Sequence, residues 1–178
     1  YQSKEILETF SEKIELARSR NKTVAGFFYE PILGVRGSVP LPLEYINGIG
    51  KICRKNNILM IADEVTTGVG RTGKFAYSQS FSEKPDILCM GKAISAGHYP
   101  VAVTLVNEKI VGAWDKLEEK GISYSQIHRR GNSITGTQEG CALGLKVLEI
   151  IDRDNLIEQV QKQGKYTLEK LKKIENYS

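Results

Sequence analysis

The sequence has few cysteines and histidines, and their spacing excludes two kinds of site. Cys53, Cys89 and Cys141 are widely spaced and form no C-x-x-C pair, which argues against a disulfide framework. His98 and His128 have no second ligand at metal-binding spacing, so we expect no metal. Unpaired cysteines are typical of a reducing compartment, so we expect a cytoplasmic protein.

Long apolar runs and concentrated charge are also missing. The longest apolar runs, such as residues 58–62, fall far short of the roughly 20 residues that a membrane helix needs, so we expect no membrane partner. The net charge of +4 comes from 25 basic and 21 acidic residues that are interleaved, so no basic stripe indicates nucleic acid. The 178 residues, 40% hydrophobic and 26% charged, predict a globular chain of about one domain.

Apolar periodicity predicts that helices and strands alternate. Residues 3–17 and 43–53 repeat apolar side chains at three- and four-residue spacing, which is typical of amphipathic helices. Four short apolar runs predict strands, at residues 24–29, 59–62, 87–90 and 101–106. We expect the first of these strands to be buried on both faces. This alternation predicts an α/β fold with a mostly parallel sheet.

The apolar pattern changes from Gly136 onward. Residues 142–151 are apolar nearly all round, which predicts a deeply buried helix. After Asp152 the apolar residues form one stripe among many lysines and glutamates, which predicts a surface helix. The change marks a soft boundary near residue 152.

A glycine block at residues 68–74 (GVGRTGK) matches G-x-G-x-x-G and nearly matches the P-loop spacing. A P-loop requires Ser or Thr after the lysine, but Phe75 stands there. A Rossmann turn requires an acid at the end of the next strand, whereas Asp86 precedes that strand. A glycine-rich loop at the carboxyl edge of the sheet is the simpler interpretation.

Charged residues follow two of the predicted strands, at the sheet edge where open α/β sheets place ligands. Asp63 and Glu64 follow one strand, and Lys92 follows another. A lysine in this place is expected to be partly desolvated, which suits Schiff-base chemistry. An ordinary salt bridge between Asp63 and Lys92 is the alternative.

Three segments together resemble the class III aminotransferases, which are pyridoxal-phosphate enzymes of fold type I. The segments are residues 61–75 (IADEVTTGVGRTGKF), 85–93 (PDILCMGKA) and 131–136 (GNSITG). The likeness extends from about Val24 to Ile151. It implies that residues 1–151 are part of the cofactor-binding large domain, with its mostly parallel sheet, and that residues 152–178 start a small C-terminal α/β domain.

The resemblance implies roles for individual residues. Lys92 would form a Schiff base with the cofactor, pyridoxal 5'-phosphate, and act as base and acid in turn. Asp63 would pair with the pyridine nitrogen. Val65 would pack against one face of the ring, and Ser133 would bind the phosphate across a dimer interface. Thr66 stands where many relatives have glutamine near the phenolic oxygen.

The implied reaction is amino-group transfer from an amine or amino acid to a keto or aldehyde acceptor, in a homodimer. An aminomutase or decarboxylase of the same family would keep Lys92 and Asp63. Members of the family are more than twice this length, and the parts that cradle the phosphate and stack on the ring would precede Tyr1. We therefore expect an incomplete chain, and the remaining alternative is a non-catalytic fragment or a half-enzyme that needs a complementing chain.

Overall fold

The computed structural model describes residues 3–123 and 135–175, and the chain divides into two compact units. The first unit comprises residues 1–63, 80–89 and 104–135, and the second comprises residues 64–79, 90–103 and 136–178. The predicted boundary near residue 152, between a large and a small domain, stays a prediction.

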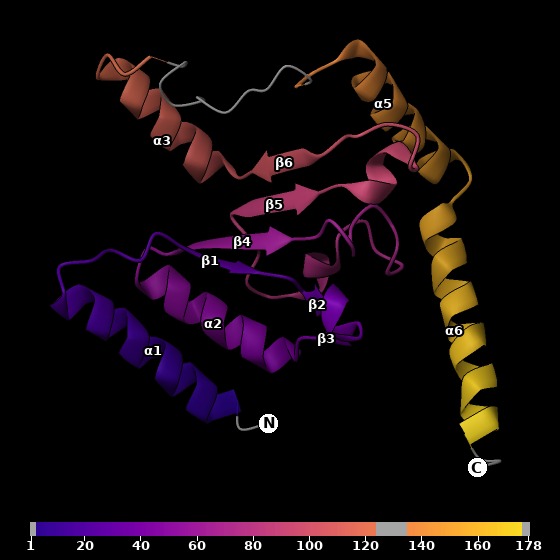
Figure 1. Ribbon diagram of the computed structural model, residues 1–178, viewed down its shortest axis with the longest axis horizontal. Helices are drawn as coiled ribbons and strands as arrows, with labels where there is room; N and C mark the ends of the chain where they lie inside the picture. Colours follow the sequence, from indigo (N-terminus) through magenta and orange to yellow (C-terminus); the bar gives the residue numbers. More distant parts are fainter. Residues whose placement is uncertain (1–2, 124–134, 176–178) are drawn as a thin grey trace. The chain divides into compact units, whose positions relative to one another are not determined.

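The first unit carries most of a four-stranded sheet (Figure 1). The strands are β1 (Gly26–Tyr29), β4 (Leu59–Asp63), β5 (Ile87–Met90) and β6 (Val103–Val106), in the order β1-β4-β5-β6. β1 pairs in parallel with β4, and β4 pairs in parallel with β5. A separate antiparallel ribbon joins β2 (Ile32–Leu33) to β3 (Val39–Pro40), with the 3-10 turn η1 (Gly34–Arg36) between them. The predicted α/β fold with a mostly parallel sheet is confirmed.

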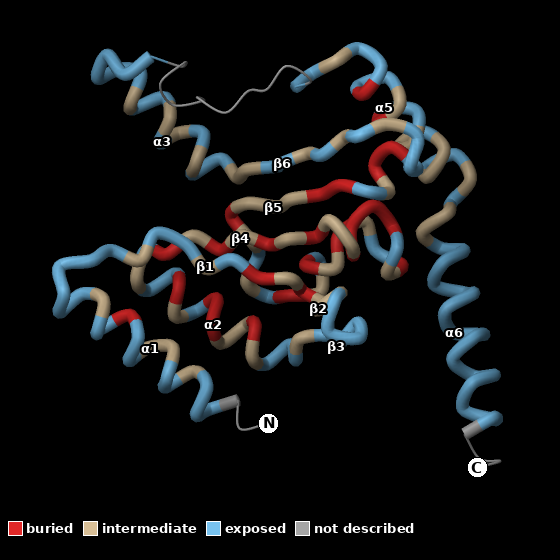
Figure 2. The backbone as a smooth tube through the Cα atoms, in the orientation of Figure 1, coloured by how far each residue is buried: buried red, intermediate tan, exposed pale blue. Residues whose placement is uncertain are grey.

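Two amphipathic helices, α1 (Ser3–Ser19) and α2 (Leu43–Lys55), lie along the part of the sheet formed by β1 and β4 (Figure 1). α2 packs on β4 and α1 packs on α2. The buried face of α2 includes Ile46, Ile49 and Cys53, and buried residues are frequent on α2 and β4 (Figure 2). Both helices were predicted from their apolar spacing, because burial of one stripe is what selects such a pattern.

β1 corrects the prediction of a strand buried on both faces. Phe27 and Tyr29 stack with ring centroids 5.6 Å apart, and Phe27 also packs on Phe10 of α1. Phe28, between them, is 61% exposed. Side chains alternate across a strand, and α1 and α2 cover the other face, so an apolar run did not mean burial on both sides.

A helix that the apolar pattern did not predict, α3 (Glu108–Glu119), follows β6. Its N-cap is Asn107, whose side-chain oxygen accepts a hydrogen bond from the backbone N–H of Ile110 over 3.2 Å. Asparagine is among the best N-cap residues, so Asn107 is the sequence feature that could have predicted the start of α3.

The second unit contains the short 3-10 helix η3 (Lys92–Ser95), the helix α5 (Gln138–Arg153) and the helix α6 (Leu156–Glu175). α5 corrects the prediction of a deeply buried helix, since only Gly140 and Gly144 are buried on it and Leu145 is 70% exposed. The reason is that α5 packs on η3 through a small residue, since a Cβ atom on Gly144 would stand 3.8 Å from the carbonyl oxygen of Ile94. A Cβ atom on Gly140 would stand 3.1 Å from Val101, in the segment after η3.

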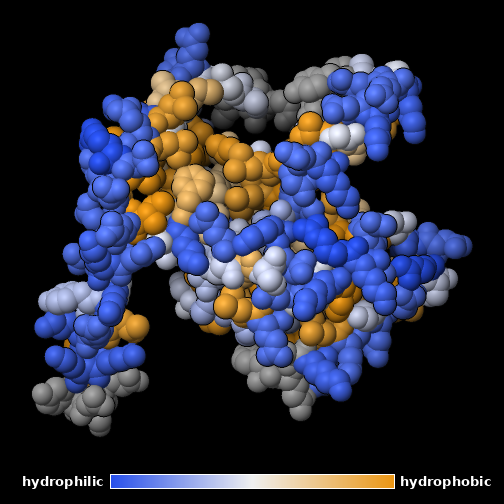
Figure 3. All heavy atoms as spheres, turned by 180° about the vertical axis from the view of Figure 1, so that it is seen from behind, coloured by the Kyte–Doolittle hydropathy of each residue, from blue (hydrophilic) through white to orange (hydrophobic). Residues whose placement is uncertain are grey.

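α6 is mostly exposed, as predicted, and hydrophilic side chains dominate its surface (Figure 3). Its apolar residues Leu168, Leu171 and Ile174 lie among lysines and glutamates and are exposed. None of the helices within the described ranges is long and apolar enough to cross a membrane.

A buried carboxylate joins several elements of the first unit. Asp86 lies directly before β5 and is 2% exposed. Its Oδ1 accepts hydrogen bonds from Arg54 of α2 over 2.5 Å and from Asn107 over 2.7 Å. Its Oδ2 accepts a bond from the backbone N–H of Met60 in β4 over 2.8 Å, and the N–H of Asp86 donates to the carbonyl of Met60. Asp86 therefore connects α2, β4 and the start of α3 to β5.

These contacts hold the pKa of Asp86 below its ordinary value. Burial pushes the pKa upward, but the hydrogen bonds from Met60, Arg54 and Asn107, together with the charge of Arg54, outweigh it. The folded state therefore binds a proton less readily than the unfolded chain does. Asp86 stabilises the fold above its ordinary pKa of 3.8, and this stabilisation is lost as the pH falls through the lower folded-state value.

Replacing Asp86 with asparagine is expected to lower the free energy of unfolding at pH 7 by about 3 kcal/mol, because Arg54 would lose the charge that it pairs with. Urea unfolding measures the change, and Asp115→Asn on the exposed surface of α3 is the matched control. The difference between Asp86→Asn and the wild type should shrink as the pH falls below 3.8. Equal stability at neutral pH would contradict this account.

Candidate active site

Lys92 begins η3 and directly follows the buried Gly91, which comes after the last residue of β5. Its φ of +45° lies in the left-handed region, which side chains other than glycine occupy only when their surroundings fix the backbone. The lysine side chain is exposed. This corrects the prediction of a partly desolvated amine, because the chain has already left the buried strand at residue 92 and entered a surface turn.

Val65 and Thr66, which follow β4, lie beside Gly91 and Lys92. Lys92 Nζ donates a hydrogen bond to Thr66 Oγ1 over 2.8 Å. A Cβ atom on Gly91 would stand 3.3 Å from Val65 Cγ1, so glycine lets the two segments approach closely. The structure therefore brings Val65 and Thr66 next to the predicted lysine within the second unit.

Asp63 ends β4 in the first unit and is half-buried. It lines a cavity of about 370 Å³ with a largely aromatic wall, made by Phe27, Phe28, Tyr29, Glu30, Leu33, Leu41 and Tyr45. Burial raises the pKa of Tyr45, so its phenol stays neutral at physiological pH. The partnership of Asp63 with a cofactor nitrogen stays a prediction. Ser133 lies outside the described residues, so its role stays a prediction too.

Glu64 is a buried acid for which no role was predicted. It is fully buried. Its Oε2 accepts hydrogen bonds from the N–H of Tyr77 over 2.6 Å and from the hydroxyl of Thr67 over 3.0 Å, and its Oε1 accepts one from the N–H of Ser78 over 2.8 Å. Glu64 therefore closes the segment 64–79 into a loop that ends at the 3-10 helix η2 (Tyr77–Ser80). The sequence feature that could have predicted this role is the place of the acid, between a buried strand and a glycine block.

The glycine block is a tight turn whose glycines are required by packing. A Cβ atom on Gly68 would stand 2.8 Å from the carbonyl oxygen of Glu64. Gly73 has φ +76°, and its carbonyl accepts a hydrogen bond from Gln161 of α6 over 2.6 Å. Residues 68–76 are all described and contain no helix, so the arrangement agrees with a glycine-rich loop and lacks the helix that a nucleotide-binding turn needs.

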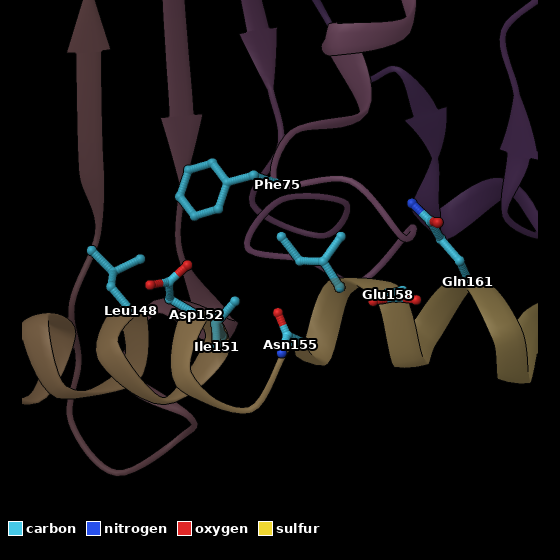
Figure 4. Close-up of a pocket in the computed structure, with 8 residues that line it drawn as sticks. Phe75, Leu148, Ile151, Asp152, Asn155, Glu158 and Gln161 are labelled. Carbon is cyan, nitrogen blue, oxygen red and sulfur yellow. The ribbon is translucent and has the colours of Figure 1, made fainter.

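A second cavity, of about 430 Å³, lies in the second unit between this loop and the turn that joins α5 to α6. Phe75 of the loop points toward residues of the two helices (Figure 4). Its other lining residues are Leu148, Ile151, Asp152, Asn155, Ile157, Glu158 and Gln161. Among the predicted site residues that the structure describes, Asp63, Val65 and Lys92 do not line this cavity, so we do not assign it to the active site.

The sequence pattern that describes the class III aminotransferases matches residues 2–178. The chain belongs to this family. It is 38% identical over 178 residues to the adenosylmethionine-8-amino-7-oxononanoate aminotransferase of Methanocaldococcus jannaschii, over 96% of this chain and 38% of that protein. It is 34% identical over 167 residues to the ornithine aminotransferase of Plasmodium yoelii yoelii, over 94% of this chain and 36% of that protein.

Solved structures of relatives have the same fold. A transaminase from the marine bacterium Virgibacillus superposes with a TM-score of 0.87 at 30% identity, over 99% of this chain and 38% of that one. A Bacillus anthracis aminotransferase superposes with a TM-score of 0.82 at 35% identity, over 94% of this chain and 36% of that one. The chain thus spans less than two fifths of the length of these relatives. Because the class III enzymes depend on pyridoxal phosphate, the family, the fold and the cofactor predicted from the sequence are confirmed.

Replacing Glu64 with glutamine is expected to loosen the segment 64–79. The new amide NH₂ would face one of the two backbone N–H groups, and a buried donor without an acceptor costs about 1–3 kcal/mol. Hydrogen exchange at the amides of Tyr77 and Ser78 should become about tenfold faster or more. Glu139→Gln, on the exposed first turn of α5, should leave it unchanged. Full protection in Glu64→Gln would show that the loop does not depend on this carboxylate.

Proposed function

We propose that this class III aminotransferase moves an amino group from an amine or amino acid to a keto or aldehyde acceptor, using pyridoxal 5'-phosphate. The observation that carries the proposal is the exposed amine of Lys92, held at a strand end in a left-handed turn and hydrogen-bonded to Thr66. The relatives named above are aminotransferases and a transaminase. This favours amino-group transfer over an aminomutase, a decarboxylase or a non-catalytic fragment.

The residues at this place suit the cofactor chemically. An exposed primary amine is the group that bonds to an aldehyde carbon, and Gly91 leaves the approach beside Val65 free of a further side chain. Asp63 would hold the ring nitrogen, Val65 would pack on the ring, and Ser133 would bind the phosphate. When bound, the cofactor supplies an electron sink for the bond that breaks at the substrate carbon.

Lys92 and Asp63 would have different roles: Lys92 would transfer protons, and Asp63 would stabilise a positive charge. In its neutral form, Lys92 Nζ accepts a proton from the amine-bearing carbon of the substrate and later returns one. Asp63 would keep a positive charge beside it, since a carboxylate stabilises a nearby cation. The amine must be free to move between these steps, and its exposure in the structure supports this.

We also propose that the protein is a cytoplasmic homodimer. The expected role of Ser133 is to bind a phosphate across a subunit interface, so a site with this role would be complete only with a second chain. Cys53, Cys89 and Cys141 are all free thiols in the structure, which supports a reducing compartment. Burial raises the pKa of Cys53 to about 11, so this thiol stays protonated and unreactive.

Lys92 is expected to be the lysine that carries the cofactor covalently. Reduction of the loaded protein with borohydride, followed by peptide mapping, should place the pyridoxyl group on residue 92. Lys92→Arg should lose the label and several orders of magnitude in turnover, because its guanidinium cannot serve as the nucleophile or the base. Lys74→Arg, in the exposed part of the glycine loop, should keep both. A label on another lysine would refute the assignment.

Replacing Asp63 with asparagine should leave the covalent attachment at Lys92 intact and slow turnover about 10²- to 10³-fold, since the loss of a shielded charge partner is worth about 3–4 kcal/mol. Single-turnover kinetics with an amino donor measure the effect. Asp152→Asn, on the exposed side of α5, is the control and should react at the wild-type rate. Near-normal turnover in Asp63→Asn would show that this acid is structural only.

A further inference from the structure

We propose that Thr66 is a positioning residue, whose hydroxyl holds the Lys92 amine ready for attachment of the cofactor. The inference rests on the proposed function of Lys92. The two side chains meet directly, since Lys92 Nζ donates to Thr66 Oγ1 over 2.8 Å. Both residues belong to the second unit.

The backbone on each side of this contact is fixed. Thr66 lies in the segment closed by the fully buried Glu64, and its neighbour Thr67 is one of the donors to that carboxylate. Lys92 has φ +45° and follows the buried Gly91, which packs against the same segment. The position of the Thr66 hydroxyl relative to the Cα and Cβ atoms of Lys92 is therefore fixed.

The rest of the lysine side chain is the mobile part. An exposed lysine has four rotatable bonds and samples many rotamers. A hydrogen bond to a hydroxyl on a fixed loop restricts the amine to one place. Because the rate of a reaction depends on how often the reacting atoms meet in the right geometry, this restriction is expected to speed attachment.

The attachment step leaves the threonine unchanged. The neutral amine of Lys92 forms a carbon–nitrogen double bond with the aldehyde carbon, and the aldehyde oxygen leaves as water with the two amine protons. A hydroxyl can accept one hydrogen bond and donate another. Thr66 can therefore stay bonded to the nitrogen before the protons leave and after.

The test compares Thr66→Val, which keeps the shape and removes the hydroxyl, with Thr66→Ser, which keeps the hydroxyl. Full-length protein is freed of cofactor and mixed with pyridoxal phosphate, and samples are quenched with borohydride at set times. Peptide mass spectrometry gives the fraction of Lys92 that is modified. We expect about three- to tenfold slower attachment in Thr66→Val, the size of one hydrogen bond, and a rate within about twofold of wild type in Thr66→Ser.

Thr104→Val, at an exposed position of β6, controls for the loss of a hydroxyl elsewhere and should attach the cofactor at the wild-type rate. The free energy of unfolding should be the same for Thr66→Val and this control. Equal slowing in Thr66→Val and Thr66→Ser, with a loss of stability, would overturn the proposal, because packing would then explain the effect.

The outcomes also separate this inference from the proposed function. If wild-type protein never becomes modified at Lys92, both are overturned. If wild type and Thr66→Val become modified at Lys92 at the same rate, the proposed function stands and only the role of Thr66 is removed.

Discussion

The first unit depends on the buried carboxylate of Asp86, which accepts hydrogen bonds from three segments that are far apart in the sequence. A buried charge is tolerated only while its partners are all in place, so helix, strand and helix cap must close around it together. Glu64 does the same within the second unit, with backbone N–H groups as partners. Glu64 follows the carboxyl end of β4, the kind of place where ligands commonly bind, whereas Asp86 stands directly before β5. Because hydrogen bonds within the protein occupy the carboxylate oxygens of Asp86 and Glu64, we place the candidate chemistry on more accessible groups such as Lys92.

Local patterns predicted the elements whose formation depends on few neighbours. Residues 87–90 form β5 with the predicted bounds, and the amphipathic spacing found α1, α2 and α6. Burial was harder to predict, because it depends on which faces other elements cover. Phe28 belongs to an apolar run and is exposed, and α5 buries Gly140 and Gly144 in place of its large side chains. The prediction also missed α3, whose start is marked by Asn107 and not by an apolar stripe.

The order of motifs along the chain pointed to Lys92 and Asp63 as candidate site residues, and the glycine block was rightly interpreted as a loop. The contact between Thr66 and Lys92 could not be predicted, because it joins residues 26 positions apart through a turn whose geometry the sequence does not state. The same holds for Glu64, whose partners become visible only once the loop is closed. Family resemblance implies roles for residues, whereas hydrogen-bond partners depend on how the segments between the strands fold.

The packing of Gln161 against Gly73 limits which residues position 73 can accept. A methyl group at position 73 would stand 2.7 Å from Gln161 Cγ, on a backbone with φ +76°. A substitution of Gly73 is therefore expected to push α6 away from the loop. At Gly112 in α3, nothing in the described part of the chain lies within 4 Å of an added Cβ atom, and alanine would favour the helix by about 1 kcal/mol. Two glycines that count equally in the composition therefore differ in what they tolerate: Gly73 has no room for a side chain beside Gln161, whereas Gly112 has room for one.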